Sequence, residues 1–147
     1  MQMSLINNEI NLLDVCKKED LILSTANIAP LSHWITPEFE TRRFDTRFFI
    51  AYLPEKQIVQ HDGMELTKSL WINPNIALKK ALDGEMQMIL PTTENLKSCM
   101  NYKNAMEMLD NQKKLSNSDI KPILPKFFKK NGNWVVLFPD DEGYEDH

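Results

Sequence analysis

The sequence is poor in the residues that mark metal centres and nucleic-acid surfaces. Its two cysteines, Cys16 and Cys99, and its three histidines are scattered, and none has the spacing of a zinc site. Lys and Arg number 17 against 21 Asp and Glu, for a net charge of -4. We therefore expect two reduced thiols and no nucleic-acid partner, because no broad basic field is available to bind phosphates.

Long apolar runs are also missing. Nowhere do about 18 apolar residues follow one another, as a membrane-spanning helix would need. The first five residues, Met1 to Leu5, include no basic stretch followed by an apolar one, so they do not resemble a secretion signal. Together with the reduced thiols, this predicts a cytoplasmic protein without a membrane partner.

The composition that remains is that of one soluble domain. The chain has 147 residues, of which 42% are hydrophobic and 26% are charged. A chain of this length buries roughly two thirds of its unfolded surface around one core, and is too short for two independent cores. We therefore expect one folded domain.

The middle of the chain has the pattern of strands. Residues 31–36 favour a strand that ends before Pro37. Residues 44–53 alternate at first and are then apolar on both faces, which predicts a central strand with Asp45 and Arg47 facing away from the core. A third strand is expected over residues 64–73.

Helix signals flank this region. Residues 8–18 predict a short amphipathic helix capped by Asn7 or Asn8. A second helix is predicted after it, with Asn73 as its N-cap, Pro74 as its first residue and Gly84 just past its end. A third helix is expected to start at Thr92, with its apolar face continuing towards Leu109.

The end of the chain predicts a hairpin. Asn131-Gly132 separates two β-favouring runs, 123–130 and 133–138, and both residues tolerate the positive φ of a tight turn. The acidic residues 140–147 are expected to fray.

An ordered series of short motifs runs through these elements. The motifs are Trp34-Ile35-Thr36-Pro37-Glu38, Arg43 to Phe49, Asp62-Gly63-Met64-Glu65, Trp71-Ile72-Asn73-Pro74, Leu90-Pro91-Thr92-Thr93, Lys121 to Pro125 and Trp134 to Pro139. In this order they resemble the later part of Nudix hydrolases, and more narrowly the branch related to peroxisomal coenzyme A diphosphatases. The resemblance extends over most of the chain from about Leu21.

The resemblance implies a fold and a division of the chain. It implies a partial Nudix-type α/β/α sandwich with a mixed sheet, plus a C-terminal β-hairpin. Residues 1–115 would be the later part of the domain, and residues 116–147 a hairpin extension of the same domain.

The motif that defines the family is absent. Nudix hydrolases contain Gly, five residues, Glu, seven residues, and then Arg-Glu-x-x-Glu-Glu-x-Gly, whose glutamates bind Mg²⁺ or Mn²⁺. No such string occurs here. The resemblance implies a metal-dependent pyrophosphohydrolase of nucleoside diphosphate-linked compounds, such as coenzyme A or its thioesters. Because the motif is absent, we expect this chain to be incomplete and inactive alone.

Two explanations of that absence remain open. In the first, a separate reading frame supplies the upstream half of the same domain, which is then a partner of this chain. The other implied partner is a nucleotide-type small molecule. Alternatively the chain is a non-catalytic remnant or interaction module of a split gene. In either case unpaired strand edges and uncovered apolar faces predict self-association.

The resemblance also indicates candidate site residues. Glu65 is an auxiliary metal ligand, a residue that helps to orient the attacking water, or a solvated glutamate beside Asp62. In the family, the region around Phe44 and Asp45 lies near the substrate cleft. Its basic side chains here, Arg42, Arg43 and Arg47, either contact phosphate or pair with Asp45, Glu38 or Glu40. The substrate-binding candidates are Trp34, Arg42, Arg43, Phe44 and Asp45.

Each aromatic candidate has an alternative role. Trp34 and Phe44 either stack on a nucleobase or belong to the core. His33 has no nucleophile or orienting acid at a recognisable spacing, so we expect either a surface histidine or a hydrogen-bonded structural one. Four further side chains are expected to pack in the interior rather than to have a functional role: Trp71, Met100, Met106 and Trp134.

Overall fold

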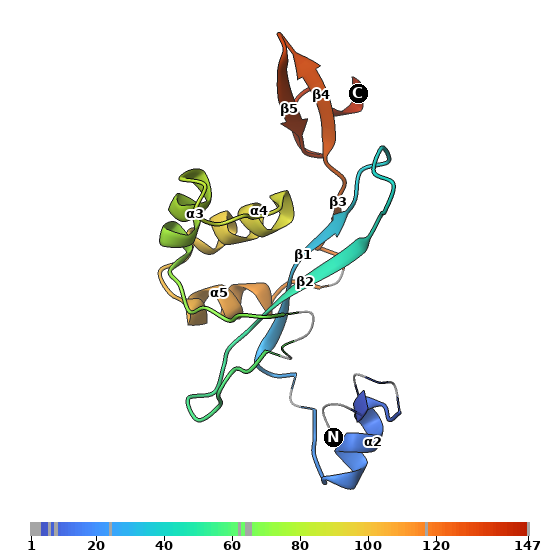
Figure 1. Ribbon diagram of the computed structural model, residues 1–147, viewed down its shortest axis with the longest axis vertical. Coiled ribbons are helices and arrows are strands. Elements are labelled where there is room, and N and C mark those ends of the chain that lie inside the picture. Colours follow the sequence, from blue (N-terminus) through green and yellow to red (C-terminus); the bar gives the residue numbers. More distant parts are fainter. Residues whose placement is uncertain are drawn as a thin grey trace.

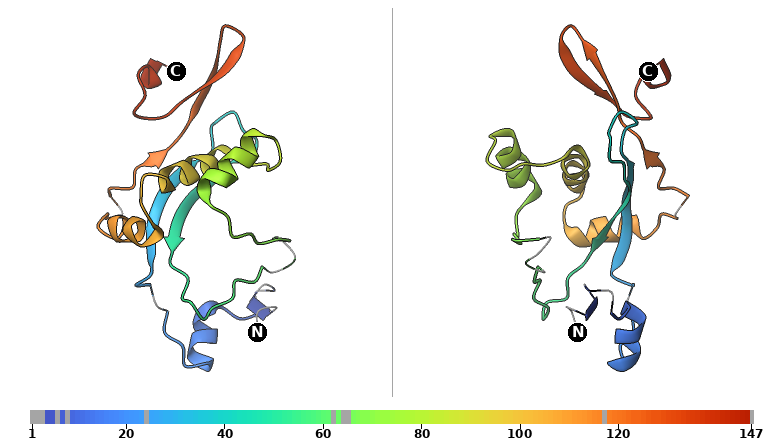
Figure 2. Two further views of the ribbon diagram at one scale, coloured as in Figure 1. Left: turned by 90° about the vertical axis from the view of Figure 1, so that its left-hand side faces the viewer. Right: turned by 45° about the vertical axis from the view of Figure 1, so that its right-hand side comes forward.

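The centre of the molecule is a small mixed sheet. In a computed structural model that describes residues 4–5, 7, 9–23, 25–61, 63, 66–116 and 118–146, β1 (Ile28–Ile35) lies between β2 (Asp45–Ala51) and β3 (Pro122–Ile123). β1 pairs antiparallel with β2 and parallel with β3. The structure is thus mixed α/β, with three helices on one side of the sheet (Figure 1; Figure 2).

The strand expected over residues 31–36 is confirmed and is longer than expected. Its register against β2 shifts between Pro30 and Ser32. Proline has no N–H to donate to a ladder, so a bulge at this point removes the need for that hydrogen bond.

The strand expected over residues 44–53 is confirmed, but its central position is wrong. β1 is the central strand, because β3 arrives from far along the chain and pairs with its second edge. β2 lies at the edge of the described sheet, where Phe49 is 59% exposed. The apolar residues on both faces of β2 therefore do not show that this strand is buried on both faces.

Three helices pack on one side of the sheet. They are α3 (Pro74–Leu82), α4 (Leu90–Cys99) and α5 (Ala105–Gln112). In α3 the Asn73 side chain accepts from the Asn75 N–H at 2.9 Å, as predicted for an N-cap. Gly84 follows the helix with φ +75° and ends it.

The third predicted helix differs at both ends. α4 begins at Leu90 rather than Thr92, because Ile89 is extended and Pro91 fits the first turn, where its missing N–H needs no acceptor. The chain then leaves the helix, and α5 starts separately at Ala105, capped by the Asn104 side chain.

The strand expected over residues 64–73 is wrong where the structure describes it. Residues 66–73 form no strand, and Leu70 and Trp71 are exposed. A strand needs a neighbour for its backbone groups, and the described sheet consists of β2, β1 and β3, without residues 67–73 among its strands.

The C-terminal hairpin is confirmed. β4 (Lys126–Lys130) pairs with β5 (Asn133–Leu137) across a turn in which Asn131 and Gly132 have φ values of 53° and 84°. The expected fraying of the tail is wrong for its described part. A short 3₁₀ helix (Tyr144–Asp146) packs back, and the buried Tyr144 hydroxyl donates to the Leu124 carbonyl at 2.7 Å.

The N-terminal helix lies at the opposite end of the molecule from the hairpin (Figure 1). α2 (Leu12–Lys18) is shorter than predicted, and its cap is Asn11 rather than Asn7 or Asn8. Asn11 and Asp14 form a capping box, each side chain accepting from the backbone N–H of the other.

The buried core is small for the length of the chain. Its buried apolar side chains are Val15, Ala29, Trp34, Ala77, Met108, Leu109 and Tyr144. The packing expected of Trp71, Met100, Met106 and Trp134 is wrong, because all four are exposed. No helix in the described part of the chain is long and apolar enough to cross a membrane.

Candidate functional site

An apolar pocket lies between the sheet and the start of α4. Its volume is about 340 Å³. The sheet contributes Trp34, Thr46 and Phe48, and α4 contributes Leu90 and Pro91. The loop between β1 and β2 and the C-terminal hairpin complete the wall with Phe39, Phe44 and Phe127 among others. A pocket of this size and lining fits a small molecule with an apolar or aromatic part.

Trp34 is held rigidly in the wall of this pocket. Its side chain is 4% exposed, and its Nε1 donates to Ser32 Oγ at 3.0 Å. Ser32 in turn donates to Asn95 Oδ1 of α4 at 2.7 Å. The core role that was one of two alternatives for Trp34 therefore fits its burial, and only part of its ring faces the pocket.

Phe44 lines the rim and is 52% exposed. Its backbone N–H donates to Thr36 Oγ1 at 3.0 Å, which fixes its position beside β1. The Arg42 guanidinium lies 5.0 Å from the centre of its ring, a cation–π contact. The rim thus has an exposed aromatic ring, and a guanidinium that does not itself line the pocket lies beside that ring.

Like Arg42, the remaining substrate-binding candidates Arg43 and Asp45 do not line the pocket. Arg43 Nε donates to the Thr36 carbonyl at 3.0 Å and ties the loop to the end of β1. Asp45 Oδ1 lies 2.5 Å from Nε2 of the buried His33. Asp45 is therefore not paired with an arginine in these contacts. Of the two alternatives for His33, the structure has the hydrogen-bonded one, because His33 is buried.

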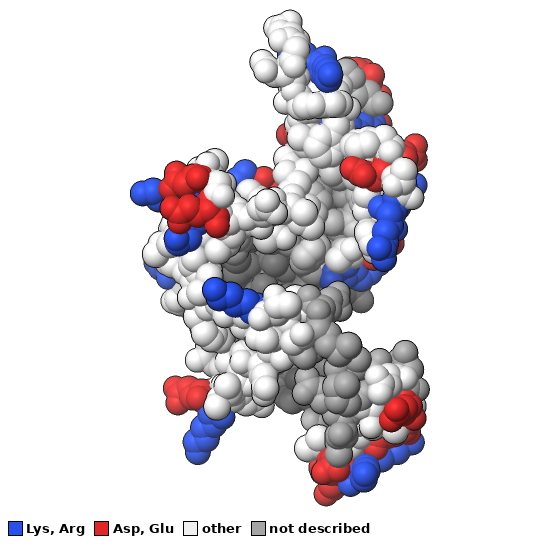
Figure 3. Space-filling view, viewed as in Figure 1, with Lys and Arg blue, Asp and Glu red and all other residues white. Residues whose placement is uncertain are grey.

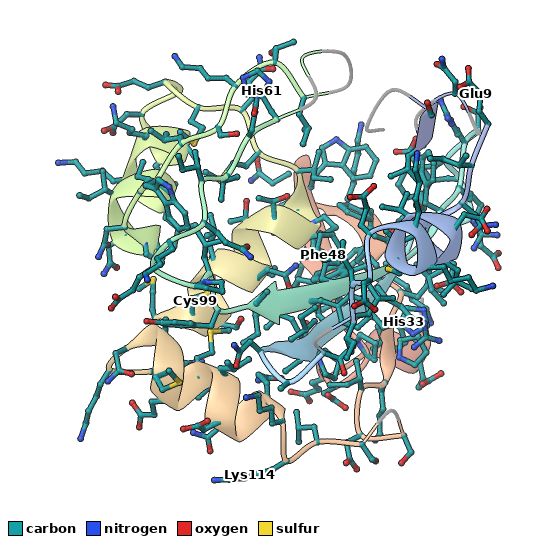
Figure 4. All side chains as sticks on the ribbon, turned by 90° about the horizontal axis from the view of Figure 1, so that it is seen from below. Glu9, His33, Phe48, His61, Cys99 and Lys114 are labelled. Carbon is teal, nitrogen blue, oxygen red and sulfur yellow. The ribbon has the colours of Figure 1, made fainter. Side chains whose placement is uncertain are left out.

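The two faces of the sheet explain this separation. Successive residues of a strand point to opposite faces, so Phe48 lies on the helix side and His33 and Asp45 on the other. Figure 4 shows Phe48 and His33 on different sides of the strand pair. The five candidates are neighbours in sequence, yet only Trp34 and Phe44 line the pocket.

The described residues do not form a metal site. No group of three or more His, Cys, Asp or Glu side chains that could hold an ion occurs among them. Mg²⁺ and Mn²⁺ prefer several converging oxygen ligands. The described part of the chain therefore does not fit the ion that the family uses, and Glu65 lies outside the described residues.

Charge is also sparse at the pocket. Glu40 is the charged side chain among its lining residues. In the space-filling view most charged side chains lie towards the edges of the molecule, and the middle of the face is largely uncharged (Figure 3).

Several residues of this region had no signal in the sequence. Phe39 and Phe127 meet edge to face with ring centres 5.6 Å apart, although they come from distant segments. Asn95 connects α4 to β1 through Ser32. A polar residue within a helix does not reveal its partner, so neither contact is predictable from local pattern.

The cysteines behave as the sequence suggested. Both are free. Burial raises the pKa of the Cys99 thiol, which donates to the Asn95 carbonyl at 3.2 Å. Such a thiol is a poor nucleophile near neutral pH.

Comparison with known proteins finds one partial similarity. The chain is 33% identical over 76 residues to acyl-coenzyme A diphosphatase NUDT19 of Xenopus laevis. The match covers 49% of this chain and 20% of that protein, so the chain spans about a fifth of the curated relative that it matches. No family model and no solved structure matches the chain.

Proposed function

We propose that this chain is part of a Nudix-type hydrolase that cleaves the pyrophosphate of a nucleoside diphosphate-linked compound, such as coenzyme A or its thioesters. The observation that carries the proposal is the 76-residue similarity to an acyl-coenzyme A diphosphatase. The pocket beside Trp34 and Phe44 supports it, because an aromatic wall beside a guanidinium suits a base next to phosphates.

In this proposal the candidate residues have different tasks. Phe44 offers a face on which a base stacks, and Arg42 contacts phosphate oxygens at the rim. Trp34 forms the rigid wall. Arg43 and Asp45 do not contact the substrate in this proposal. They position Phe44, because their contacts with Thr36 and His33 hold the loop and strand beside it.

The ion is the part that the described residues do not supply. Mg²⁺ or Mn²⁺ would place positive charge on the phosphate oxygens and make water nucleophilic. We propose that the carboxylates for it come from outside the described residues, with Glu65 as an auxiliary ligand and the upstream half of the domain as the main source. The isolated chain would then bind a nucleotide without hydrolysing it.

Binding tests this proposal first. Titration calorimetry with coenzyme A and with ADP, in the absence of metal, measures the affinity of the chain. Phe44→Ala is expected to weaken binding about 5-fold to 150-fold, because stacking contributes roughly 1–3 kcal/mol per base. Equal affinity of Phe44→Ala and the unchanged chain would contradict the site.

Phe49→Ala is the matched control. Phe49 is 59% exposed and Phe44 52% exposed, and Phe49 extends from the strand face opposite the pocket. Its removal deletes the same kind of ring from β2, the strand that directly follows Phe44, and we expect no change in affinity.

Turnover is the second test. The chain alone is expected to release no product from coenzyme A with Mg²⁺, whereas a mixture with the polypeptide encoded upstream is expected to be active. No turnover above either part alone would count against the hydrolase.

A non-catalytic module is the second candidate. The lack of a metal-binding cluster among the described residues favours it. It predicts neither nucleotide affinity at the pocket nor turnover in the mixture, so the two tests distinguish the candidates.

A further inference from the structure

The outer edge of β2 presents unpaired backbone groups. The Thr36 N–H donates to the Phe44 carbonyl at 3.0 Å, and the Tyr52 N–H donates to the Asn27 carbonyl at 2.9 Å. Even-numbered residues at both ends of β2 therefore turn their backbone towards β1. Because backbone groups alternate along a strand, the odd-numbered residues from Asp45 to Ala51 turn theirs outwards. Within the described sheet no strand pairs with that edge.

The charges on this edge make it complementary to itself. A second β2 in antiparallel orientation must place odd-numbered residues opposite odd-numbered ones. With Thr46 at the two-fold axis, Asp45 of each copy lies opposite Arg47 of the other. An axis at Asp45 or Arg47 puts like charges together, and an axis at Phe48 leaves Arg47 opposite Phe49. Opposite charges stabilise a cross-strand pair and like charges destabilise it, so the charges favour Thr46.

The side chains are available for such pairing. The Asp45 side chain is 65% exposed even with its contact to His33, and Arg47 is exposed. In this register Phe44 lies opposite Phe48 of the partner subunit. Both are on the helix side and line the apolar pocket, so the second copy extends the pocket wall.

The exposed surface of the chain also calls for a partner. The accessible area is 11965 Å² for a mass of 17.1 kDa. A compact monomer of this mass exposes about 7,800 Å². The surplus is about 4,000 Å², whereas a specific interface of standard size buries about 1,200–2,000 Å² in total. One such interface can be formed entirely from surface that a compact chain would not expose.

We propose that two copies of this chain associate through β2, antiparallel, with Thr46 at the two-fold axis and two Asp45–Arg47 pairs across it. The two described three-stranded sheets then form one continuous sheet. This dimer is independent of the proposed function, since association is measured without substrate.

Charge reversal tests the register. Sedimentation velocity over a range of concentrations should show a dimer for the unchanged chain. Asp45→Arg and Arg47→Asp each create two like-charge pairs, and each is expected to weaken self-association on the order of tenfold or more. A mixture of the two variants restores both pairs and should form a heterodimer, and the double variant Asp45→Arg/Arg47→Asp should again form a homodimer.

Lys56→Glu is the control for net charge. It changes the charge by as much as Arg47→Asp but lies in the turn after β2, so it should leave the dimer unchanged. Circular dichroism checks the fold of each variant, and the heterodimer shows that both single variants remain competent to bind. A chain that stays monomeric, single variants that still self-associate, an equal effect of Lys56→Glu, or a mixture without heterodimer would each overturn the proposal.

Discussion

At the scale of single residues, neighbours in sequence have different surroundings. Phe44 lines the pocket, while Asp45, the next residue, contacts His33 on the other face. The sequence predicted that both belong to one functional stretch. The alternation along the strand did predict that Asp45 faces away from the core. It did not predict that Phe44 lines a pocket, because the pocket wall includes α4 and the C-terminal hairpin, which are distant in sequence.

Tyr144 allows a test at this scale. Its hydroxyl donates to the Leu124 carbonyl at 2.7 Å, so Tyr144→Phe should lower the free energy of unfolding by about 1–2 kcal/mol at neutral pH. Urea unfolding measures the difference. Tyr52→Phe, an exposed tyrosine, is the control and should change stability little. An equal loss in both variants would contradict a specific role for the Tyr144 hydroxyl.

The same hydroxyl makes this stability depend on pH. Burial raises the pKa of Tyr144 above its ordinary value of 10.0. The folded state thus retains a proton that the unfolded state loses first, so the stabilisation is complete below pH 10.0 and falls as the pH rises further. The difference between Tyr144→Phe and the unchanged chain should shrink above that pH.

At the scale of elements, those with local signals were predicted and those that need a distant partner were not. α3 has a cap, a first-turn proline and a terminating glycine within its own residues, and the hairpin has Asn131-Gly132. Each signal acts through nearby backbone groups. β3, in contrast, is a strand only because β1 lies beside it.

The end of α3 provides a prediction for this scale. Gly84 has φ +75°, and the Glu85 N–H donates to the Lys80 carbonyl at 2.9 Å to close the helix. An added Cβ would meet no atom within 4 Å, so Gly84→Ala tests the backbone conformation alone. We expect a loss of about 1–2 kcal/mol in the free energy of unfolding.

Gly84→Asn is the matched variant, because asparagine tolerates the left-handed region better than alanine does. It should cost less than Gly84→Ala in the same urea unfolding experiment. A larger loss for asparagine would show that something other than backbone conformation is limiting.

At the scale of the whole molecule, the large exposed surface links stability to association. If dimerisation stabilises the fold, unfolding of the dimer to separate chains depends on concentration, by about 1.4 kcal/mol for each tenfold change. The urea midpoint of the unchanged chain should therefore rise with protein concentration. The midpoint of Arg47→Asp should stay constant, and a constant midpoint for both would argue against a stabilising dimer.

The amino-acid sequence by itself determined the elements whose signals are local, the absence of the Nudix metal motif, and the resemblance that the partial similarity to an acyl-coenzyme A diphosphatase supports. Only the tertiary structure decided that β2 lies at an edge, that Trp34 and Phe44 share a pocket, and that the core is small. The physical reason is the separation in sequence of the residues that interact. Caps and turns depend on bonds between residues a few positions apart, whereas burial, register and pockets depend on which distant segments meet.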